Sequence, residues 1–233
     1  MSGIMQRTIA IGDVHGYDVA LRAVLDQICP EPSDTIVMLG DYVDRGPGSR
    51  EVIDLLIDLQ SHVHLVPILG NHDEMMLSIW LGSHDLFDDW LHYGGSATLE
   101  SYGVTKLEGI PLAHIDFLKH CYPFFESRDH IFLHANYDED RPLNAQDVYT
   151  LRWESLRQRV PGPHVSGKRV IVGHTAQRNF ELLNLGYLVC IDTCCYGGGW
   201  LTALDVQSGQ IWQADAEGHV RTRNLALLSE GRG

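Results

Sequence analysis

Positive charge, paired cysteines and long apolar runs are all scarce in this sequence. Its 17 lysines and arginines stand against 31 aspartates and glutamates, which gives a formal net charge of −14. A surface with this excess of carboxylates repels nucleic-acid backbones and anionic membranes, so we expect neither as a partner. Excess carboxylates ordinarily form a solvated surface, although some of them can also serve as ligands for cations.

The cysteines do not indicate a disulfide framework. There are five, an odd number, and no two stand in a C-x-x-C arrangement. Cys194 and Cys195 are adjacent, so a bridge between them would be strained. This usage is typical of a reducing compartment. We find no signal peptide and no long uncharged apolar run, so the sequence predicts a soluble cytoplasmic protein, with a monomer as the default.

Strand and helix patterns alternate in the first third of the chain. Three apolar, β-branched runs at 8–11, 35–39 and 63–69 alternate with two helical patterns, the second from about residue 50 to 59. In the first helical pattern the residues expected on one side are Val19, Leu21, Val24, Leu25 and Ile28. This β-α-β-α-β order predicts parallel neighbouring strands joined by right-handed crossovers.

The rest of the chain is helical first and rich in strands afterwards. Residues 74–120 have mostly helical patterns, and shorter strand-like runs follow at 131–133, 169–172, 187–191, 200–206 and 210–212. No low-complexity tract or change of composition divides the chain, which predicts one domain over residues 1–233. The two halves together predict an α/β (α+β) fold in which two packed mixed β-sheets are flanked by helices.

Residues that can bind metal follow five of the predicted strands. Ligands of open α/β sheets bind beyond the carboxyl ends of the strands. The metal-capable residues at these ends are Asp13 with His15, Asp41, Asn71, His134 and His174. A single residue of this kind after a strand is usually a helix cap or a turn residue. Five strand ends that all carry one indicate a common site.

The chemistry of this set suits two divalent metal ions. Carboxylate and amide oxygens together with imidazole nitrogens suit manganese, iron or zinc better than calcium or an all-sulfur site. Six ligands are too many for one catalytic ion with an open position, but they fit two ions bridged by a carboxylate and a water. Such a pair, about 4 Å apart, can clamp the attacking and leaving oxygens of a phosphoryl group. We expect Mn²⁺ first, with iron or zinc as alternatives.

Three motifs resemble those of the phosphoprotein phosphatase family of calcineurin-like metallophosphoesterases. They are Gly12-Asp13-Val14-His15-Gly16, Gly40-Asp41-Tyr42-Val43-Asp44-Arg45-Gly46 and Gly70-Asn71-His72-Asp73. Residues 133–137 and 173–175 are similar to the two later histidine motifs of the family, and the resemblance extends from about residue 8 to 206. The small size and the His-Ala-Asn sequence at 134–136 are most similar to the bacterial and bacteriophage serine/threonine protein phosphatases of this family.

The resemblance implies a role for each matched residue. The first metal ion would be bound by Asp13, His15 and Asp41, and the second by Asp41 as the bridge together with Asn71, His134 and His174. His72 would be the general acid for the leaving group, paired with Asp44. The pairing is physically reasonable, because a carboxylate beside an imidazole favours the protonated form that an acid needs.

The resemblance also implies arginines that bind the substrate phosphate. Arg45 would bind phosphate oxygens in a bidentate fork. A second arginine is expected near Leu151-Arg152-Trp153-Glu154, where the residue order departs from the family pattern. Arg152 is therefore the first candidate and Arg157 the second.

Other aromatic and polar residues are given structural roles. Trp80, Trp90 and Tyr93 are expected to pack in the interior or line the wall of a cleft, and the glycines at 197–199 to form a tight turn. The remaining histidines, including His114, have no matching spacing and are given no role in the site.

Two substrate classes stay open within this family. A serine/threonine protein phosphatase, acting on a phosphoprotein or a small phosphoester, is favoured by the Asp44–Arg45 pair and the short chain. Residues 45–49 and Asp73 also resemble bacterial symmetrical diadenosine tetraphosphate hydrolases, which use the same metal core on a phosphoanhydride. Those enzymes tend to be longer and usually lack an aspartate at the position of Asp44.

The alternative from another class is a catalytically inactive domain that only binds a partner. Degenerate relatives lose metal ligands, whereas every expected ligand and His72 are present here. We therefore expect an active hydrolase.

Overall fold

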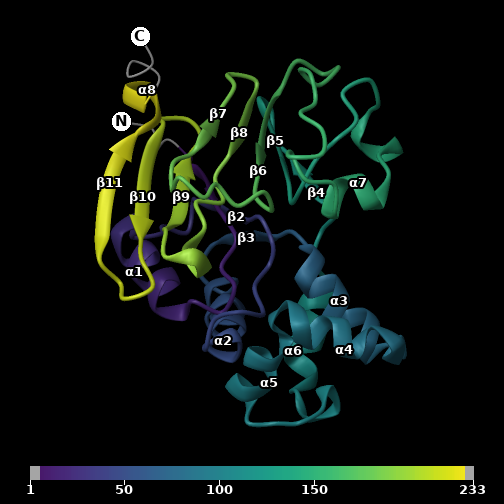
Figure 1. Cartoon of the computed structure of the whole chain (residues 1–233). Coiled ribbons are helices and arrows are strands. Elements are labelled where there is room, and N and C mark those ends of the chain that lie inside the picture. The colour runs from purple at the N-terminus through teal and green to yellow at the C-terminus, as the bar shows by residue number, and fades with distance from the viewer. Residues whose placement is uncertain (1–5, 229–233) are drawn as a thin grey trace.

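Two mixed β-sheets lie face to face at the centre of the structure, a computed structural model that describes residues 6–228 (Figure 1). The first sheet contains, in spatial order, β11 (Val220–Asn224), β10 (Gln210–Ala214), β9 (Leu201–Asp205), β1 (Thr8–Ile11), β2 (Thr35–Met38) and β3 (His64–Pro67). The second contains β4 (Phe124–Glu126), β5 (His130–Leu133), β6 (Arg169–Val172), β8 (Leu188–Cys190) and β7 (Leu183–Asn184). The predicted fold of two packed mixed sheets with helices outside is confirmed.

Parallel strands form the middle of each sheet. In the first sheet β1, β2 and β3 are parallel, and β9 pairs with β1 in the antiparallel direction. In the second sheet β5, β6 and β8 are parallel, with antiparallel β4 and β7 at the edges. Because the carboxyl ends of parallel neighbours meet at one edge, five loops that follow strands gather on the same side of the sandwich.

Alternating side chains divide the core into layers. In β1, Ile9 and Ile11 pack toward the helices, whereas Ala10 packs toward the second sheet. β2 repeats this pattern, with Ile36 and Met38 on the helical side and Val37 facing the second sheet. The period of two follows from strand geometry. A third apolar layer covers the outer face of the second sheet, where short segments including α7 (Val148–Arg152) pack.

Two helices, α1 (Asp18–Ile28) and α2 (Ser49–Leu59), cover the outer face of the first sheet (Figure 1). The apolar face of α1 contains Leu21, Val24, Leu25 and Ile28, as predicted. Val19 is 47% exposed, so its predicted place on that face is wrong. Successive residues of a helix are rotated by about 100°, so Val19 lies just outside the buried stripe, and Ala20 takes the inward position instead.

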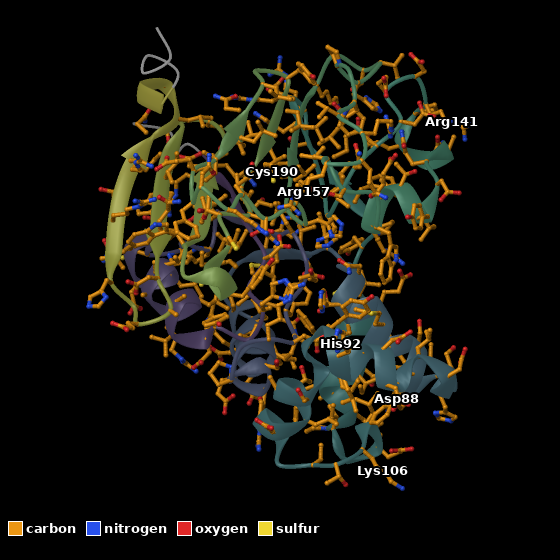
Figure 2. All side chains as sticks on the ribbon, in the orientation of Figure 1. Asp88, His92, Lys106, Arg141, Arg157 and Cys190 are labelled. Carbon is orange, nitrogen blue, oxygen red and sulfur yellow. The ribbon has the colours of Figure 1, made fainter. Side chains whose placement is uncertain are left out.

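The predicted helical region after β3 forms a separate layer at one end of the molecule (Figure 1). It consists of α3 (Asn71–Trp80), α4 (Phe87–Trp90), α5 (Ser96–Tyr102) and α6 (Leu112–Lys119), joined by short 3₁₀ and π segments. Figure 2 marks this layer with Asp88, His92 and Lys106, and the outer corner of the opposite part of the molecule with Arg141. Among residues 6–228 no helix is both long and apolar enough to cross a membrane.

Three strands were not predicted: β4, β7 and β11. β4 and β7 have three and two residues, which is too short for a periodic pattern to be recognised. β11 is an edge strand whose sequence, Val-Arg-Thr-Arg-Asn, is mostly polar. Edge strands commonly carry such charged residues because they protect the exposed backbone from pairing with other chains.

Candidate metal centre

The predicted metal ligands meet at the shared edge of the two sheets. Asp13 follows β1, Asp41 follows β2, and Asn71 begins α3 directly after β3. His134 follows β5, and His174 follows β6. The first sheet thus supplies the oxygen ligands together with His15, and the second supplies two imidazoles, so the site lies where the two sheets adjoin.

Asp41 stands between two groups of possible ligands. Its Oδ2 lies 3.4 Å from Nε2 of His15, and its Oδ1 lies 3.5 Å from Nε2 of His134. One group of converging side chains is His15, Asp41 and His72, and the other is Asp41, His134 and His174. The imidazoles also form two pairs, with ring centroids 4.8 Å apart for His15 and His72 and 5.0 Å apart for His134 and His174. This arrangement suits a carboxylate that is shared by two cations.

The hydrogen bonds of the second group leave lone pairs that face one another. Nδ1 of His134 lies 2.8 Å from the Leu39 carbonyl, and Nε2 of His174 lies 3.1 Å from the Trp153 carbonyl, so these nitrogens must carry hydrogen. The opposite nitrogens then present lone pairs to Oδ1 of Asn71, at 3.0 and 2.9 Å. Three acceptors this close repel one another unless a cation lies between them, so these residues fit a metal ion.

The protonation preferences of the buried histidines separate into two types. Burial lowers the pKa of His174 to about 4, and it also lowers the pKa of His15 and of His134. These three imidazoles are therefore neutral near pH 7, which is the form that binds metal. Burial would lower the pKa of His72 as well, but the carboxylates of Asp41 and Asp44 outweigh it and raise this pKa above its ordinary value.

Asp13 is held slightly apart from these two groups. Its carboxylate accepts the backbone N–H of His174 at 2.9 Å. Burial, together with the nearby carboxylates of Asp192 and Asp41, raises the pKa of Asp13 well above its usual range. Three buried carboxylates close together favour binding of a cation, because each disfavours ionisation of the others. The role of Asp13 as a ligand stays a prediction.

Two glycines allow these side chains to come close to the backbone. A Cβ atom added at Gly70 would lie 2.2 Å from Oδ1 of Asp41, and one added at Gly173 would lie 2.0 Å from Oδ1 of Asp13. Both distances are far shorter than a contact between a Cβ atom and an oxygen atom can be. Any larger residue at position 70 or 173 would therefore displace a carboxylate of the site.

Several residues of the site have left-handed backbone conformations. The φ angles are 48° at His15, 51° at Asp41, 71° at Asp44, 73° at Arg45 and 59° at His174. Non-glycine residues rarely adopt these angles, and such strain persists only where the surroundings hold it in place. No pattern in the sequence indicates this strain.

Asp73 holds the strained loop after β2. Its Oδ2 accepts the backbone N–H of Asp41 at 2.8 Å and of Gly70 at 3.0 Å, and its Oδ1 accepts that of Tyr42 at 2.9 Å. It thus joins the second and third motifs through backbone contacts. In the sequence, the position of Asp73 after Asn71-His72 is the one signal of this role, and it does not reveal the backbone contacts.

His72, Asp44 and Arg45 form a connected group beside the ligands. Nδ1 of His72 lies 2.7 Å from Oδ2 of Asp44. Asp44 also accepts bonds from the Trp90 indole at 3.0 Å and from the Thr98 hydroxyl at 2.8 Å, which fix its orientation. Trp90 is fully buried as predicted, but its polar contact, like that of Thr98, was missed because no spacing in the sequence connects these positions.

Arg45 lies between two imidazoles. Its guanidinium nitrogens are 2.7 Å from Nε2 of His15 and 2.9 Å from Nε2 of His72, and its plane lies over the ring of Tyr196 at 4.1 Å. A guanidinium group can only donate, so both Nε2 atoms accept in this arrangement. Tyr196 was not predicted as part of the site; it belongs to the short turn η5 (Cys195–Gly197), close to the turn expected from the glycines.

The two candidates for the second phosphate-binding arginine lie in different surroundings. Arg152 donates to Glu74, whose other oxygen accepts the Trp153 indole N–H at 2.7 Å. Its Nε is buried and has no hydrogen-bond partner among the described residues. Arg157 is exposed and donates to the Ala176 carbonyl. Neither guanidinium forms a hydrogen bond to a predicted metal ligand in the described part of the chain.

Comparison with known proteins agrees with this geometry. Residues 6–178 match the model of the calcineurin-like phosphoesterase family, and the chain belongs to this family. Its fold implies divalent metal ions, for which the histidine and aspartate groups at the sheet edge are the candidate ligands.

Curated relatives match over a short stretch. The symmetrical bis(5'-nucleosyl)-tetraphosphatase of Klebsiella pneumoniae (strain 342) is 47% identical over 76 residues, which cover 32% of this chain and 26% of that protein. The enzyme of the same name from Pectobacterium atrosepticum is 43% identical over equal coverage. The match therefore spans about a quarter of the length of these relatives.

Solved structures match over nearly the whole chain at low identity. The crystal structure of a proposed diadenosine tetraphosphatase has a TM-score of 0.66 and 21% identity, covering 96% of both chains. A cold-active protein-tyrosine phosphatase of a Shewanella species has a TM-score of 0.66 and 18% identity, covering 93% of this chain and 80% of its own. A serine/threonine phosphatase of Saccharomyces cerevisiae has a TM-score of 0.62 and 17% identity, covering 96% and 81%. These likenesses show the fold.

Proposed function

We propose that this metallophosphoesterase hydrolyses dinucleoside polyphosphates with two divalent metal ions, Mn²⁺ being the first to test. The position of Asp41 between His15 on one side and His134 with His174 on the other is the observation that supports a two-metal site. When bound, such ions polarise a phosphoryl group and lower the pKa of a water molecule. The ligands we assign are Asp13, His15, Asp41, Asn71, His134 and His174.

The choice of substrate follows the curated relatives. The sequence alone favours a serine/threonine protein phosphatase, whereas the matching curated proteins are named as symmetrical tetraphosphatases. A polyphosphate also needs less help from a general acid than a phosphoserine ester does, because a nucleotide phosphate is a good leaving group. We therefore place dinucleoside tetraphosphates first.

A protein phosphatase remains the second candidate, because of the His72–Asp44 pair. An alkoxide released from phosphoserine must be protonated as it leaves, and a buried imidazole held 2.7 Å from a buried carboxylate can supply that proton. Because Nδ1 of His72 bonds to Asp44, the transferable proton belongs on Nε2. That atom becomes free for a proton when substrate phosphate draws Arg45 away from it.

A comparison of two substrates tests the proposed function. Enzyme loaded with a defined metal is given diadenosine tetraphosphate and a set of phosphoserine and phosphothreonine peptides, and kcat/KM is measured for each. We expect the tetraphosphate to be preferred and to yield two molecules of ADP. A preference for the peptides would replace the first candidate with the second.

The shared position of Asp41 has a consequence for metal binding. Asp41→Asn removes a charge that faces both ligand groups, whereas Asp13→Asn removes one at the side of the site. We expect the metal content per chain to fall further in the Asp41 variant. Equal metal content in the two variants, measured by elemental analysis, would contradict the bridging role.

A further inference from the structure

A hollow lies on the surface beside the residues that follow His174 in the sequence. It has a volume of about 270 Å³ and is lined by Leu156, Arg157, Thr175, Ala176, Gln177, Arg178, Asn179 and Leu183. The segment 175–179 continues the loop that carries His174. Figure 2 shows Arg157 near the middle of the molecule, whereas Arg141 projects from an outer corner.

The charges around this hollow differ from those of the chain as a whole. The net charge of the chain is −14, yet the two charged residues that line the hollow are both arginines. Neither Arg157 nor Arg178 has an ion pair within residues 6–228, whereas Arg22, Arg141 and Arg223 each pair with a carboxylate. Arg157 donates one hydrogen bond to the Ala176 carbonyl, and neither guanidinium charge is neutralised by a carboxylate within those residues, so both can attract an anion.

The two segments that carry these arginines are held in place by hydrogen bonds. The backbone N–H of Gln177 donates to the Asp192 carbonyl at 2.9 Å, and the Thr175 hydroxyl accepts the backbone N–H of Leu156 at 2.9 Å. The Asp192 side chain is the nearby carboxylate that Arg157 influences, but it is buried and does not line the hollow. The arginines thus extend from a fixed backbone toward solvent.

We propose that Arg157 and Arg178 bind phosphates of the substrate beyond the one that is hydrolysed. This subsite rests on the proposed function, since it requires a substrate with a polyphosphate chain. Guanidinium groups bind phosphate oxygens through paired hydrogen bonds, and the hollow adjoins the loop of a metal ligand.

A compact polyphosphate fits this surface better than an acidic peptide. A polyphosphate concentrates its charge within a hollow of this size, where both guanidinium groups can reach it. An extended acidic peptide would also have to lie across a surface that carries an excess of carboxylates and would be repelled there.

The test compares substrates with and without distal phosphates. The variants are Arg157→Ala, Arg178→Ala and the double variant, with Arg141→Ala as the control because Arg141 is exposed and pairs with Asp138 at 3.0 Å. For diadenosine tetraphosphate we expect KM to rise roughly three- to tenfold for each arginine removed. For p-nitrophenyl phosphate, which has one phosphate, kcat and KM should stay unchanged in the Arg178→Ala variant, and the control should match the unaltered protein on both substrates. A rise in KM for p-nitrophenyl phosphate in Arg157→Ala would assign Arg157 to the hydrolysed phosphate and overturn its place in the subsite.

A second measurement tests the subsite independently of whether diadenosine tetraphosphate is the substrate. Inorganic tripolyphosphate is used to inhibit p-nitrophenyl phosphate hydrolysis, with the free metal concentration held constant. Weaker inhibition of the double variant supports the subsite even if diadenosine tetraphosphate is not hydrolysed, in which case only the proposed function fails. Equal inhibition of both proteins overturns the subsite, and so does a rise in KM that is confined to phosphopeptides with flanking acidic residues.

Discussion

Within residues 6–228, His72 and His114 are both buried and both form a hydrogen bond with an aspartate side chain, yet their protonation preferences are opposite. At the sheet edge His72 lies 2.7 Å from Asp44, and in the helical layer His114 lies 3.0 Å from Asp54 on α2. The pKa of His72 is raised, whereas burial lowers the pKa of His114. A short contact to a carboxylate is therefore not enough to make a histidine an acid.

The surroundings of each aspartate explain the difference. The Asp44 side chain is fully buried, and a second buried carboxylate, Asp41, also favours the protonated form of His72. The Asp54 side chain is 55% exposed, so water screens its charge, and it lies 3.7 Å from Arg50. His114 instead accepts a hydrogen bond from the Tyr102 hydroxyl at 2.7 Å, which requires a lone pair on Nδ1.

Removing divalent metal should abolish the chemistry of the site around His72, whereas a change in the helical layer should not alter this dependence on metal. Chelator-treated protein should lose hydrolysis by at least about a hundredfold and regain it on addition of Mn²⁺. The same dependence should be found in a His114→Leu variant, because His114 lies outside the site. Activity is measured beside elemental analysis, and full activity in protein shown to be free of metal would contradict the assignment.

The loss of activity caused by substituting His72 should depend on the leaving group of the substrate. His72→Asn should reduce kcat for a phosphoserine peptide by about 10² to 10⁴-fold, the usual contribution of a general acid. It should reduce p-nitrophenyl phosphate hydrolysis much less, because nitrophenolate leaves without a proton. Asp44→Asn should show a milder form of the same pattern.

The control for His72 is the metal content, which should be unchanged in both variants. If His72 were instead a metal ligand or only bound phosphate, both substrates would be affected alike. Equal losses on the two substrates would therefore argue against the acid role.

Substitution of His114 should instead reduce stability. His114→Leu leaves the buried Tyr102 hydroxyl without its acceptor, and we expect the free energy of unfolding to fall by about 1–3 kcal/mol. Denaturant unfolding measures this loss. Adding Tyr102→Phe removes the unpaired hydroxyl, so the double variant should be less destabilised than the two single changes added together. Simple additivity would show that the bond contributes nothing specific.

The smallest expected effect is on the pH dependence of stability. The pKa of His114 in the folded protein lies below its ordinary value of 6.5, so the unfolded chain binds the proton more readily. The folded protein favours neutral His114, and the stability that this preference contributes is fully present above about pH 6.5 and is lost as pH falls toward the pKa of the folded protein. Between pH 7.5 and 5.5 the free energy of unfolding of the unaltered protein should fall by up to about 1 kcal/mol more than that of the His114→Leu variant. Parallel pH profiles of the two proteins would contradict this.

The strand pattern and the convergence of the proposed metal ligands could be predicted because each depends on local sequence. Apolar runs such as residues 8–11 and 169–172 became strands with the expected bounds, and His134 and His174 lie beside Asp41 and Asn71 as their places after strands implied. Parallel strands bring such positions to one edge whatever the intervening residues are.

Contacts between distant segments could not be predicted. The bond between Trp90 and Asp44 and the ring of Tyr196 beneath Arg45 depend on how the helical layer and a late turn pack against the sheet edge. His72 and His114 cannot be distinguished by local composition either. Their difference comes from burial of the partner carboxylate, which only the packed structure determines.

The pairing of β1 with β9 affects how the chain can assemble. Ile9 lies opposite Asp205, so the central strand of the first sheet obtains its second neighbour only after almost two hundred intervening residues are available. During synthesis on the ribosome, the edge of β1 that later pairs with β9 therefore stays unpaired until β9 has been made. Such long-range pairing slows folding and exposes a surface on which other chains can add strands. A chaperone that covers this edge would be expected to increase the yield of folded protein more than one that acts on the helical layer.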